Sequence, residues 1–260
     1  MTTVQEIIDK LLQPVQLRDR TTDRLIVGDP GKRVSRIAVA FSPAYATLEQ
    51  AAAWNADLLI VHEPVFYSHY DETDWLAGDR VFENKLRLIQ TSDLAIYRFH
   101  DYLHDYRPDG ILAGLLQALD WQQYADPKHP HVIRIPPVPA ERLAAELKQK
   151  LGLARIQYYG RPDQQIATVC LSPGMEGGKR QIGKLREHQA DLLLVGETHS
   201  WETDEYIQDA AAMGMAKSMM LLGHRTSEEA GMRRGADWLA PLFPSLSVRF
   251  FAGCSMDIWL

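Results

Sequence analysis

Histidine and carboxylate side chains follow three short apolar runs in this 260-residue sequence. The runs are Leu58–Val61, Leu94–Phe99 and Ser218–Leu222. The six polar residues that follow them are His62, Glu63, His100, His104, His224 and Glu228. Imidazole nitrogens and carboxylate oxygens suit zinc, manganese or iron, and no cysteine lies nearby to suggest a structural thiolate site. The sequence therefore predicts a metal site built from these six side chains.

The spacing of these residues indicates how many ions they bind. Two of the groups contain a pair four residues apart, whose members point the same way if the chain turns helical after the strand. His62 and Glu63 are adjacent and are expected to point to different sides, which favours two neighbouring ions over one. Two ions about 3.5–4 Å apart can share a water molecule and lower its pKa, which makes a nucleophile at neutral pH.

Short apolar runs alternate with helical patterns along the chain, which is typical of β-α units around a parallel or mixed sheet. Strands are expected at Ile37–Phe41, Leu58–Val61 and Leu94–Phe99. Helices are expected over residues 4–12, Ala46–Asn55, Arg80–Gln90, Gly110–Leu119 and Ala140–Leu151. In open α/β sheets, ligands bind outside the carboxyl ends of strands, which is where the six polar residues lie.

The pattern of the first part of the chain returns in the last part. Three segments are echoed in the same order: GDPGKRVSRIAVAFSP by GRPDQQIATVCLSP, ADLLIVHE by ADLLLVGE, and AIYRFHDYLH by SMMLLGHRTSEE. These echoes predict an α/β fold of two related halves, residues 1–126 and 160–260, each with a mixed sheet. Residues 127–159 are expected to form a proline-rich connection with an edge strand and a helix. The metal site is then expected at the strand ends between the halves.

Composition argues against several functional classes. Hydrophobic residues make up 46% of the chain and charged residues 24%, which is typical of a globular protein. The net charge of −6 argues against general nucleic-acid or membrane-surface binding, because both need basic patches. The first residues lack a signal-type apolar core, and the two cysteines give no disulfide framework. We therefore expect a cytoplasmic protein.

At the metal-binding candidates the sequence resembles the Nif-three-like dinuclear metal proteins, also called GTP cyclohydrolase I type 2 homologues. The resemblance covers almost the whole chain, including ADLLIVHEPVFY, AIYRFHDYLHD and GHRTSEE. The family's Gly-His-x-x-Ser-Glu motif is matched fully at residues 223–228. Its His-His-Pro motif has Glu63 in place of the second histidine, and its His-x-x-Leu-Asp motif has His104 in place of the aspartate. One histidine and one carboxylate have exchanged places, so the ligand set still has four histidines and two carboxylates.

The resemblance implies a metal-dependent hydrolase that acts on a small molecule, with a purine nucleotide such as GTP as the substrate class. Two divalent ions (Zn, Mn or Fe) would activate a water molecule that opens the purine imidazole ring with release of formate. Such a metal pair is also compatible with phosphoester or amide hydrolysis. The family further implies a ring-shaped homohexamer. The alternative is a non-catalytic metal-binding or regulatory protein that uses the ring as a scaffold.

Other residues near the strand ends are weaker candidates. His199 is a candidate proton donor. Glu197 corresponds to Glu63 in the repeat. It could be a catalytic carboxylate, a hydrogen-bond acceptor that holds a metal ligand, or a surface group. Asp101 is expected to form a turn or to hold an imidazole in place, and the alternative is that it is itself a substitute metal ligand. The glycine-rich SPGMEGGK lacks the full phosphate-loop pattern and is expected to be a plain strand-to-helix turn.

Overall fold

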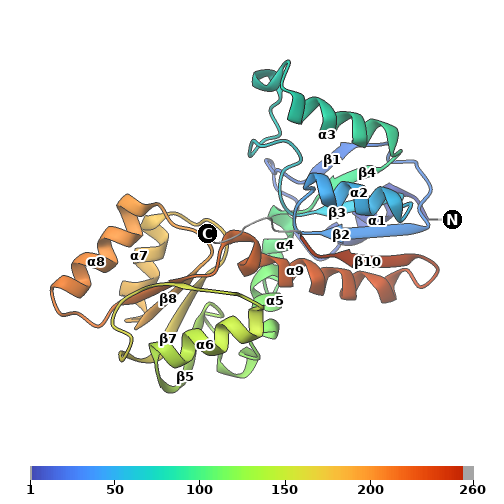
Figure 1. Ribbon diagram of the computed structural model, residues 1–260. Coiled ribbons are helices and arrows are strands. Elements are labelled where there is room, and N and C mark those ends of the chain that lie inside the picture. The colour runs from blue at the N-terminus through green and yellow to red at the C-terminus, as the bar shows by residue number, and fades with distance from the viewer. Residues whose placement is uncertain (1, 254–260) are drawn as a thin grey trace. The chain divides into compact units, whose positions relative to one another are not determined.

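Two five-stranded mixed sheets form the framework of the computed structural model, in which residues 2–253 are described (Figure 1). The chain divides into two compact units, and each unit contains one sheet. The first unit comprises Met1–Gly110 with Gly231–Leu260, and the second comprises Ile111–Ala230. The boundaries between the units fall within helices α5 (Gly110–Ala118) and α9 (His224–Leu239). This confirms the predicted α/β class with mixed sheets.

The first sheet has the strand order β1-β4-β3-β2-β10. Its strands are β1 (Arg24–Val27), β2 (Arg36–Ala40), β3 (Leu58–Val61), β4 (Ala95–Arg98) and β10 (Ser247–Phe251). All neighbours pair in parallel except β1, which runs antiparallel to β4 at one edge. The helices of this unit are α1 (Val4–Leu12), α2 (Tyr45–Ala53), α3 (Arg80–Thr91) and the short α4 (Asp101–Asp105), with 3-10 turns η1 (Asp74–Leu76) and η4 (Ala240–Leu242).

The second sheet has the strand order β5-β7-β8-β9-β6. Its strands are β5 (Val132–Pro139), β6 (Gln157–Tyr159), β7 (Gln165–Ser172), β8 (Leu192–Val195) and β9 (Ser218–Leu221). The three central strands are parallel, and β5 and β6 are antiparallel edge strands. Helices α6 (Ala140–Leu151), α7 (Gly178–Glu187) and α8 (Glu205–Ala212) and turns η2 (Gln122–Tyr124) and η3 (Ser200–Asp204) complete the unit.

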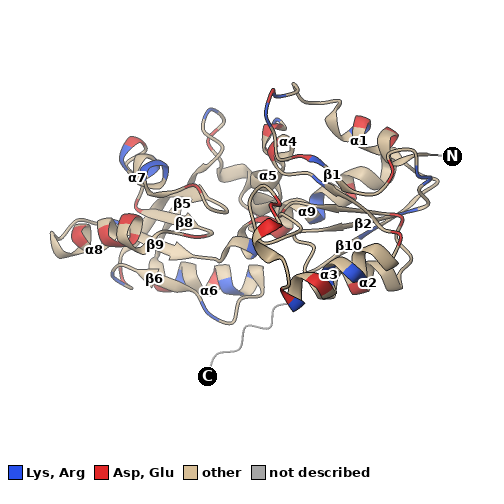
Figure 2. Ribbon diagram, turned by 90° about the horizontal axis from the view of Figure 1, so that it is seen from above, with Lys and Arg blue, Asp and Glu red and all other residues tan. Residues whose placement is uncertain are grey.

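Helices cover the faces of both sheets, which explains the continuous apolar runs in the sequence. All four residues of β3 are buried, as are all four of β8, because parallel strands covered on both faces are apolar throughout. In the second unit, charged residues lie on α7 and α8 whereas β8 and β9 have none (Figure 2). The proline-rich β5 is at an edge, as predicted, where missing backbone donors cost least. None of the described helices is both long and apolar enough to cross a membrane.

A shared hydrogen-bonding device relates the two halves of the chain. Asp57, just before β3, accepts hydrogen bonds from the backbone of Ser35 and Arg36 at 2.7 and 2.9 Å. Asp191, just before β8, accepts equivalent bonds from Ala167 and Thr168 at 3.0 and 2.9 Å. Each aspartate therefore fixes the start of a central strand against its neighbour. The sequence echo thus corresponds to a structural repeat.

The structural units and the halves expected from the repeat divide the chain at different places. Residues after α9 return to the first unit, because β10 pairs in parallel with β2 from Ser247 opposite Arg36 to Phe251 opposite Ala40. At the other boundary, most of α5 belongs to the second unit, where Leu115 and Leu119 enter its apolar core.

Candidate metal centre

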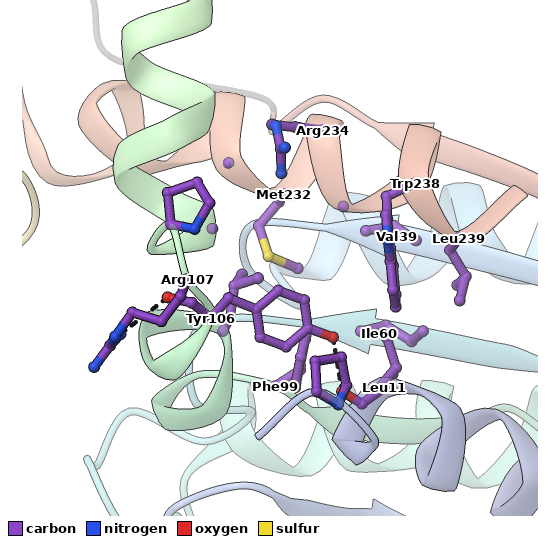
Figure 3. A pocket seen from close by; sticks show the side chains of 16 residues that line it. Leu11, Val39, Ile60, Phe99, Tyr106, Arg107, Met232, Arg234, Trp238 and Leu239 are labelled. Atoms are coloured by element: carbon purple, nitrogen blue, oxygen red, sulfur yellow. Dashed lines mark hydrogen bonds between the residues drawn. The ribbon is translucent and has the colours of Figure 1, made fainter. Parts of the chain in front are cut away.

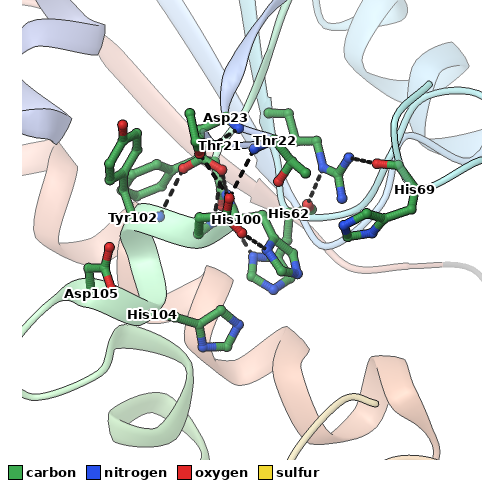
Figure 4. Close-up of polar contacts among 12 residues, drawn as sticks. Thr21, Thr22, Asp23, His62, His69, His100, Tyr102, His104 and Asp105 are labelled. Carbon is green, nitrogen blue, oxygen red and sulfur yellow. Dashed lines mark hydrogen bonds and ion pairs between the residues drawn. The ribbon is translucent and has the colours of Figure 1, made fainter. Parts of the chain in front are cut away.

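The rings of His62, His100 and His104 converge in the first unit (Figure 4). His62 directly follows β3, His100 precedes the first residue of α4, and His104 lies within that helix. Each ring offers a nitrogen, and the three nitrogens lie within 4.8 Å of one another. His62 is fully buried, whereas the other two are partly exposed. We call these three residues the histidine group.

Every member of the histidine group has its Nδ1 atom in a hydrogen bond. The partners are the carbonyl oxygen of Phe99 for His62 (3.1 Å), the Asp101 carboxylate for His100 (2.9 Å) and the Asp109 carboxylate for His104 (3.0 Å). A neutral imidazole must donate its Nδ1 proton to these acceptors, which puts the ring lone pair on Nε2. This is the tautomer and orientation that metal-binding histidines adopt when a neighbouring group holds the other nitrogen.

Helix α4 is fixed in place by Asp23, which lies far away in the sequence. Its carboxylate accepts hydrogen bonds from the backbone N–H groups of His100, Asp101 and Tyr102 at 2.9, 2.8 and 3.0 Å (Figure 4). These are the amides that a short helix leaves without intrahelical partners. Burial raises the pKa of Asp23 in spite of these donors. Displacement of the Asp23 carboxylate would therefore shift His100 and His104 together.

Asp101 acts as a bridge between His100 and the segment before β1. One carboxylate oxygen contacts His100, and the other accepts hydrogen bonds from the Thr22 backbone and the Thr21 hydroxyl, both at 2.9 Å. The hydrogen bond to His100 holds the pKa of Asp101 well below its usual value. Burial lowers the pKa of His100, which favours the neutral ring that binds metals. The expectation that Asp101 holds an imidazole is confirmed.

Glu63 lies close to the histidine group. A carboxylate oxygen of Glu63 and a ring nitrogen of His62 are within 4.8 Å of each other. Adjacent residues on a strand would diverge, but the strand has ended at Val61. The backbone N–H groups of His62 and Glu63 both donate to the carbonyl oxygen of Phe41 at 3.0 Å, so the chain turns here. One ligand atom of each residue thus lies near the other, and the expected divergence of the two side chains stays a prediction.

A buried cation lies beneath this region. The Arg98 side chain at the end of β4 is 1% exposed, and its Nε atom donates to the carbonyl oxygen of His62 at 3.3 Å. It also donates to the carbonyl oxygen of His69 and lies 3.8 Å from the Asp71 carboxylate. Arg98 therefore connects the turn after β3 to the loop that follows it. Sequence reasoning missed this residue, because an arginine inside an apolar run gives no sign of its partners.

The second unit brings His224, Glu228 and Glu197 together. The His224 Nδ1 atom is 3.1 Å from a Glu197 oxygen, and its Nε2 atom is 3.1 Å from a Glu228 oxygen. His224 is the first residue of α9, so Glu228 lies one turn along the helix on the same side, as the spacing predicted. Glu197 thus has the same relation to His224 that Asp101 has to His100. We call His224 and Glu228 the helix pair.

Two glycines make room for the helix pair. Gly174, in the turn after β7, has a φ of +62°, and a Cβ atom there would collide with the Glu228 carboxylate. Its backbone N–H donates to the Ser227 hydroxyl at 3.0 Å, and that hydroxyl donates to the His224 carbonyl oxygen at 2.6 Å. Gly196 lies against the Gly174 backbone, where its own Cβ would come within 2.6 Å. The turn therefore packs directly against the two candidate ligands.

The remaining candidates have other positions. His199 precedes η3 and stacks on Trp201 with 4.8 Å between ring centroids. The SPGMEGGK segment is the turn from β7 to α7, and the first amide of that helix, Gly178, is hydrogen-bonded to the Glu202 carboxylate at 2.8 Å. The segment is thus a strand-to-helix turn, as predicted, and a protein carboxylate contacts the start of its helix.

The donor set fits divalent transition-metal ions. Three imidazole nitrogens within 4.8 Å of one another, with tautomers set by outer hydrogen bonds, suit zinc, manganese or iron. The carboxylates of Glu63 and of Glu228, for which Gly174 leaves space, add oxygen donors of the type these ions accept.

Sequence reasoning missed Asp23 and Asp109. Asp109 gave a weak signal, as a carboxylate five residues after a candidate histidine, whereas Asp23 gave none.

Comparison with known proteins places the sequence among relatives of similar length. A family model described as Duf34/NIF3 (NGG1p interacting factor 3) matches residues 1–254. A Yersinia pestis protein named GTP cyclohydrolase 1 type 2 homolog is 25% identical over 223 residues, which are 85% of each chain. An Escherichia coli (strain K12) protein of the same name is 24% identical over 242 residues, which are 92% of each chain.

A solved structure has the same fold. The Bacillus cereus protein related to NIF3 superimposes with a TM-score of 0.77 at 14% sequence identity. The match covers 100% of this chain and 99% of that chain. At this identity the likeness concerns the fold alone, with its two α/β halves.

Proposed function

Because the chain belongs to the Duf34/NIF3 family, we propose that it binds two divalent metal ions and acts as a metal-dependent hydrolase. The names of its Yersinia pestis and Escherichia coli relatives suggest the cyclohydrolase type of reaction, in which water opens the imidazole ring of a purine nucleotide. The observation that carries the proposal is the histidine group, with three nitrogens within 4.8 Å and each Nδ1 atom held by an acceptor.

We assign six residues as ligands of the two ions. They are His62, Glu63, His100, His104, His224 and Glu228. Divalent zinc, manganese or iron would supply a Lewis acid and lower the pKa of a water molecule. Four imidazoles and two carboxylates are too many donors for a single tetrahedral ion, which supports two ions.

The chain's other residues would orient the ligands and handle protons. Asp101, Asp109 and Glu197 hold Nδ1 protons, so that each attached imidazole keeps its Nε2 lone pair. Glu197 is therefore assigned to positioning His224. His199, which precedes η3, is the candidate proton donor to the opening ring, because an imidazole can act as a general acid.

The experiment is a turnover assay on metal-loaded protein with GTP and a panel of other nucleotides. Loss of the purine absorbance is the readout for ring opening, and formate is released only when a second water molecule hydrolyses the resulting formamide. We expect turnover in the wild type and in His129→Ala, an exposed histidine that is none of the six assigned ligands, and none in His100→Ala. A thermal melt must show that His100→Ala remains folded. Full metal content without turnover on any nucleotide would contradict the hydrolase and favour the non-catalytic scaffold.

We also propose a homohexamer, on the basis of the family resemblance. Light scattering in neutral buffer should give a mass near six times 29.5 kDa at micromolar concentration. A mass near 29.5 kDa would contradict this assembly.

A further inference from the structure

A cavity of about 290 Å³ lies within the first unit, and none of the six candidate ligands is among its lining residues (Figure 3). Its floor is formed by Val39 of β2 and Ile60 of β3, on the sheet face opposite that covered by α2 and α3. Leu11 of α1, Trp238 of α9 and Tyr106 after α4 form its walls. The lining is mainly apolar and aromatic, and the volume is at the lower end of the range for small-molecule sites.

Helix α9 keeps this space open. Gly231 and Gly235 are four residues apart on the helix and both line the cavity. A Cβ atom added at Gly235 would meet no atom within 4 Å. Glycine inside a helix lowers its stability relative to alanine, and apolar interiors are normally filled. Local stability therefore does not explain glycine at this position, whereas space for a bound molecule does.

One cationic side chain at the cavity has no anionic partner in the described part of the chain. Arg234 lines the cavity and is half-buried, and no carboxylate within residues 2–253 forms an ion pair with it. The other arginine of the lining, Arg107, donates to the carbonyl oxygens of residues 104–106 at the end of α4. The Tyr106 hydroxyl is likewise engaged, since it donates to the Leu11 carbonyl oxygen at 2.7 Å. Arg234 is thus the polar group best placed to recognise a ligand.

We propose that this cavity binds a small amphipathic carboxylate, with its apolar body on the sheet floor and its carboxylate at Arg234. A single guanidinium matches the charge of a monoanion and pairs with both carboxylate oxygens through parallel N–H bonds. The apolar body would lie beside Trp238 and Tyr106, whose rings are 5.7 Å apart at 73°. None of the six assigned ligands lines the cavity, although Phe99 and Leu103, which are neighbours of His100 and His104 in the sequence, do. The wild type and Arg234→Met should therefore have the same metal content.

The test uses 8-anilinonaphthalene-1-sulfonate, an aromatic monoanion whose fluorescence rises in apolar sites, and decanoate as competitor. We expect saturable binding of one dye molecule per chain, displaced by decanoate and at least tenfold less well by decanol, which lacks the charge. Arg234→Met should weaken decanoate binding by about tenfold or more. Equal displacement by decanoate and decanol, or no effect of Arg234→Met, would overturn the role of Arg234.

A matched pair of glycine variants tests the location. Gly235→Leu would fill the cavity, whereas Gly183→Leu places the same side chain on α7, where a Cβ also has space. Melting curves and metal content check that both variants fold. Dye binding should be lost in Gly235→Leu and kept in Gly183→Leu. Dye binding that persists in Gly235→Leu, or is absent from the wild type, would overturn the proposal. A smaller oligomer in Gly235→Leu would mean that a second copy of the chain occupies the cavity, which would also overturn it.

Discussion

At the scale of single residues, the candidate centre is defined as much by the outer hydrogen bonds as by the ligands. Four imidazoles have Nδ1 in contact with an acceptor, which is a carboxylate in three cases and a backbone carbonyl in the fourth. Such partners fix the ring orientation and make the ligand more basic. Histidines with only solvent around them would have neither constraint. The arrangement is therefore the one that a bound cation would require.

Removing one outer carboxylate should weaken metal binding without unfolding the protein. We expect Asp109→Asn to lower metal affinity by about 10- to 100-fold, because His104 loses an anionic acceptor for its Nδ1 proton. Competition with a chelator of known affinity measures the change. The control is Asp105→Asn, which lies next to His104 in α4 but is paired with Arg18. Equal affinities of the two variants would exclude a role of Asp109 in the centre.

The exchanged residues Glu63 and His104 should compensate for each other. Both have ligand atoms within 4.8 Å of one on His62. Glu63→His removes a negative charge and His104→Asp adds one, so each single variant should lose or change its metal. The double variant restores four histidines and two carboxylates and should recover occupancy, with coupling of about 0.5–3 kcal/mol. Elemental analysis of the four proteins measures this, and purely additive losses would refute compensation.

At the scale of elements, short strands and helices are positioned by side chains from elsewhere in the chain. Asp23 caps α4, and Asp57 and Asp191 each fix the start of a central strand. A half-buried carboxylate that accepts two backbone N–H bonds satisfies donors that no other group reaches. The two aspartates precede β3, which ends directly before His62, and β8, which ends two residues before Glu197. Their effect on the centre is therefore indirect, through the register of β3 and β8.

Loss of either strand-start aspartate should destabilise the protein. We expect Asp57→Ala and Asp191→Ala each to lower the free energy of unfolding by about 1–3 kcal/mol, because two backbone N–H groups lose their acceptor. Urea denaturation measures the change. Asp163→Ala removes an exposed aspartate paired with Arg161 and should change stability by less than about 0.5 kcal/mol. Similar free energies of unfolding for all three variants would show that the hydrogen bonds of Asp57 and Asp191 contribute nothing to stability.

At the scale of the whole molecule, candidate ligands come from both units. The histidine group and Glu63 belong to the first unit, and the helix pair belongs to the second. The apolar cores of the two units consist of other residues. Folding should therefore not require the metal, whereas bound metal should add stability by mass action.

Chelation should lower the melting temperature of the metal-loaded protein without abolishing its folding. A ligand at 100 times its Kd adds about 2.7 kcal/mol of stability, and removal reverses this. His224→Ala should lose metal, melt near the temperature of the chelated wild type and respond little to chelator. Calorimetry beside elemental analysis measures both effects. Full metal content in His224→Ala would remove this residue from the centre.

The sequence alone determined the parts of this protein that depend on local pattern. Continuous apolar runs predicted β3 and β4, prolines placed β5 at an edge, and the echoed segments predicted the repeat now seen in Asp57 and Asp191. Burial on two faces and the helical period leave a signature within a few residues. The candidate ligands were found in the same way, because strand ends are recognisable from where the apolar runs stop.

Only the tertiary structure decided which distant segments meet. The pairing of β10 with β2, the cap that Asp23 gives to α4 and the turn that brings Glu63 toward His62 had no local signal. Asp23 and His100 are 77 residues apart in the sequence. Nothing in the sequence distinguishes an aspartate that caps a helix from one that faces water. A pattern records that a residue is buried or polar. The identity of its partner depends on how the whole chain closes on itself, which no single segment specifies.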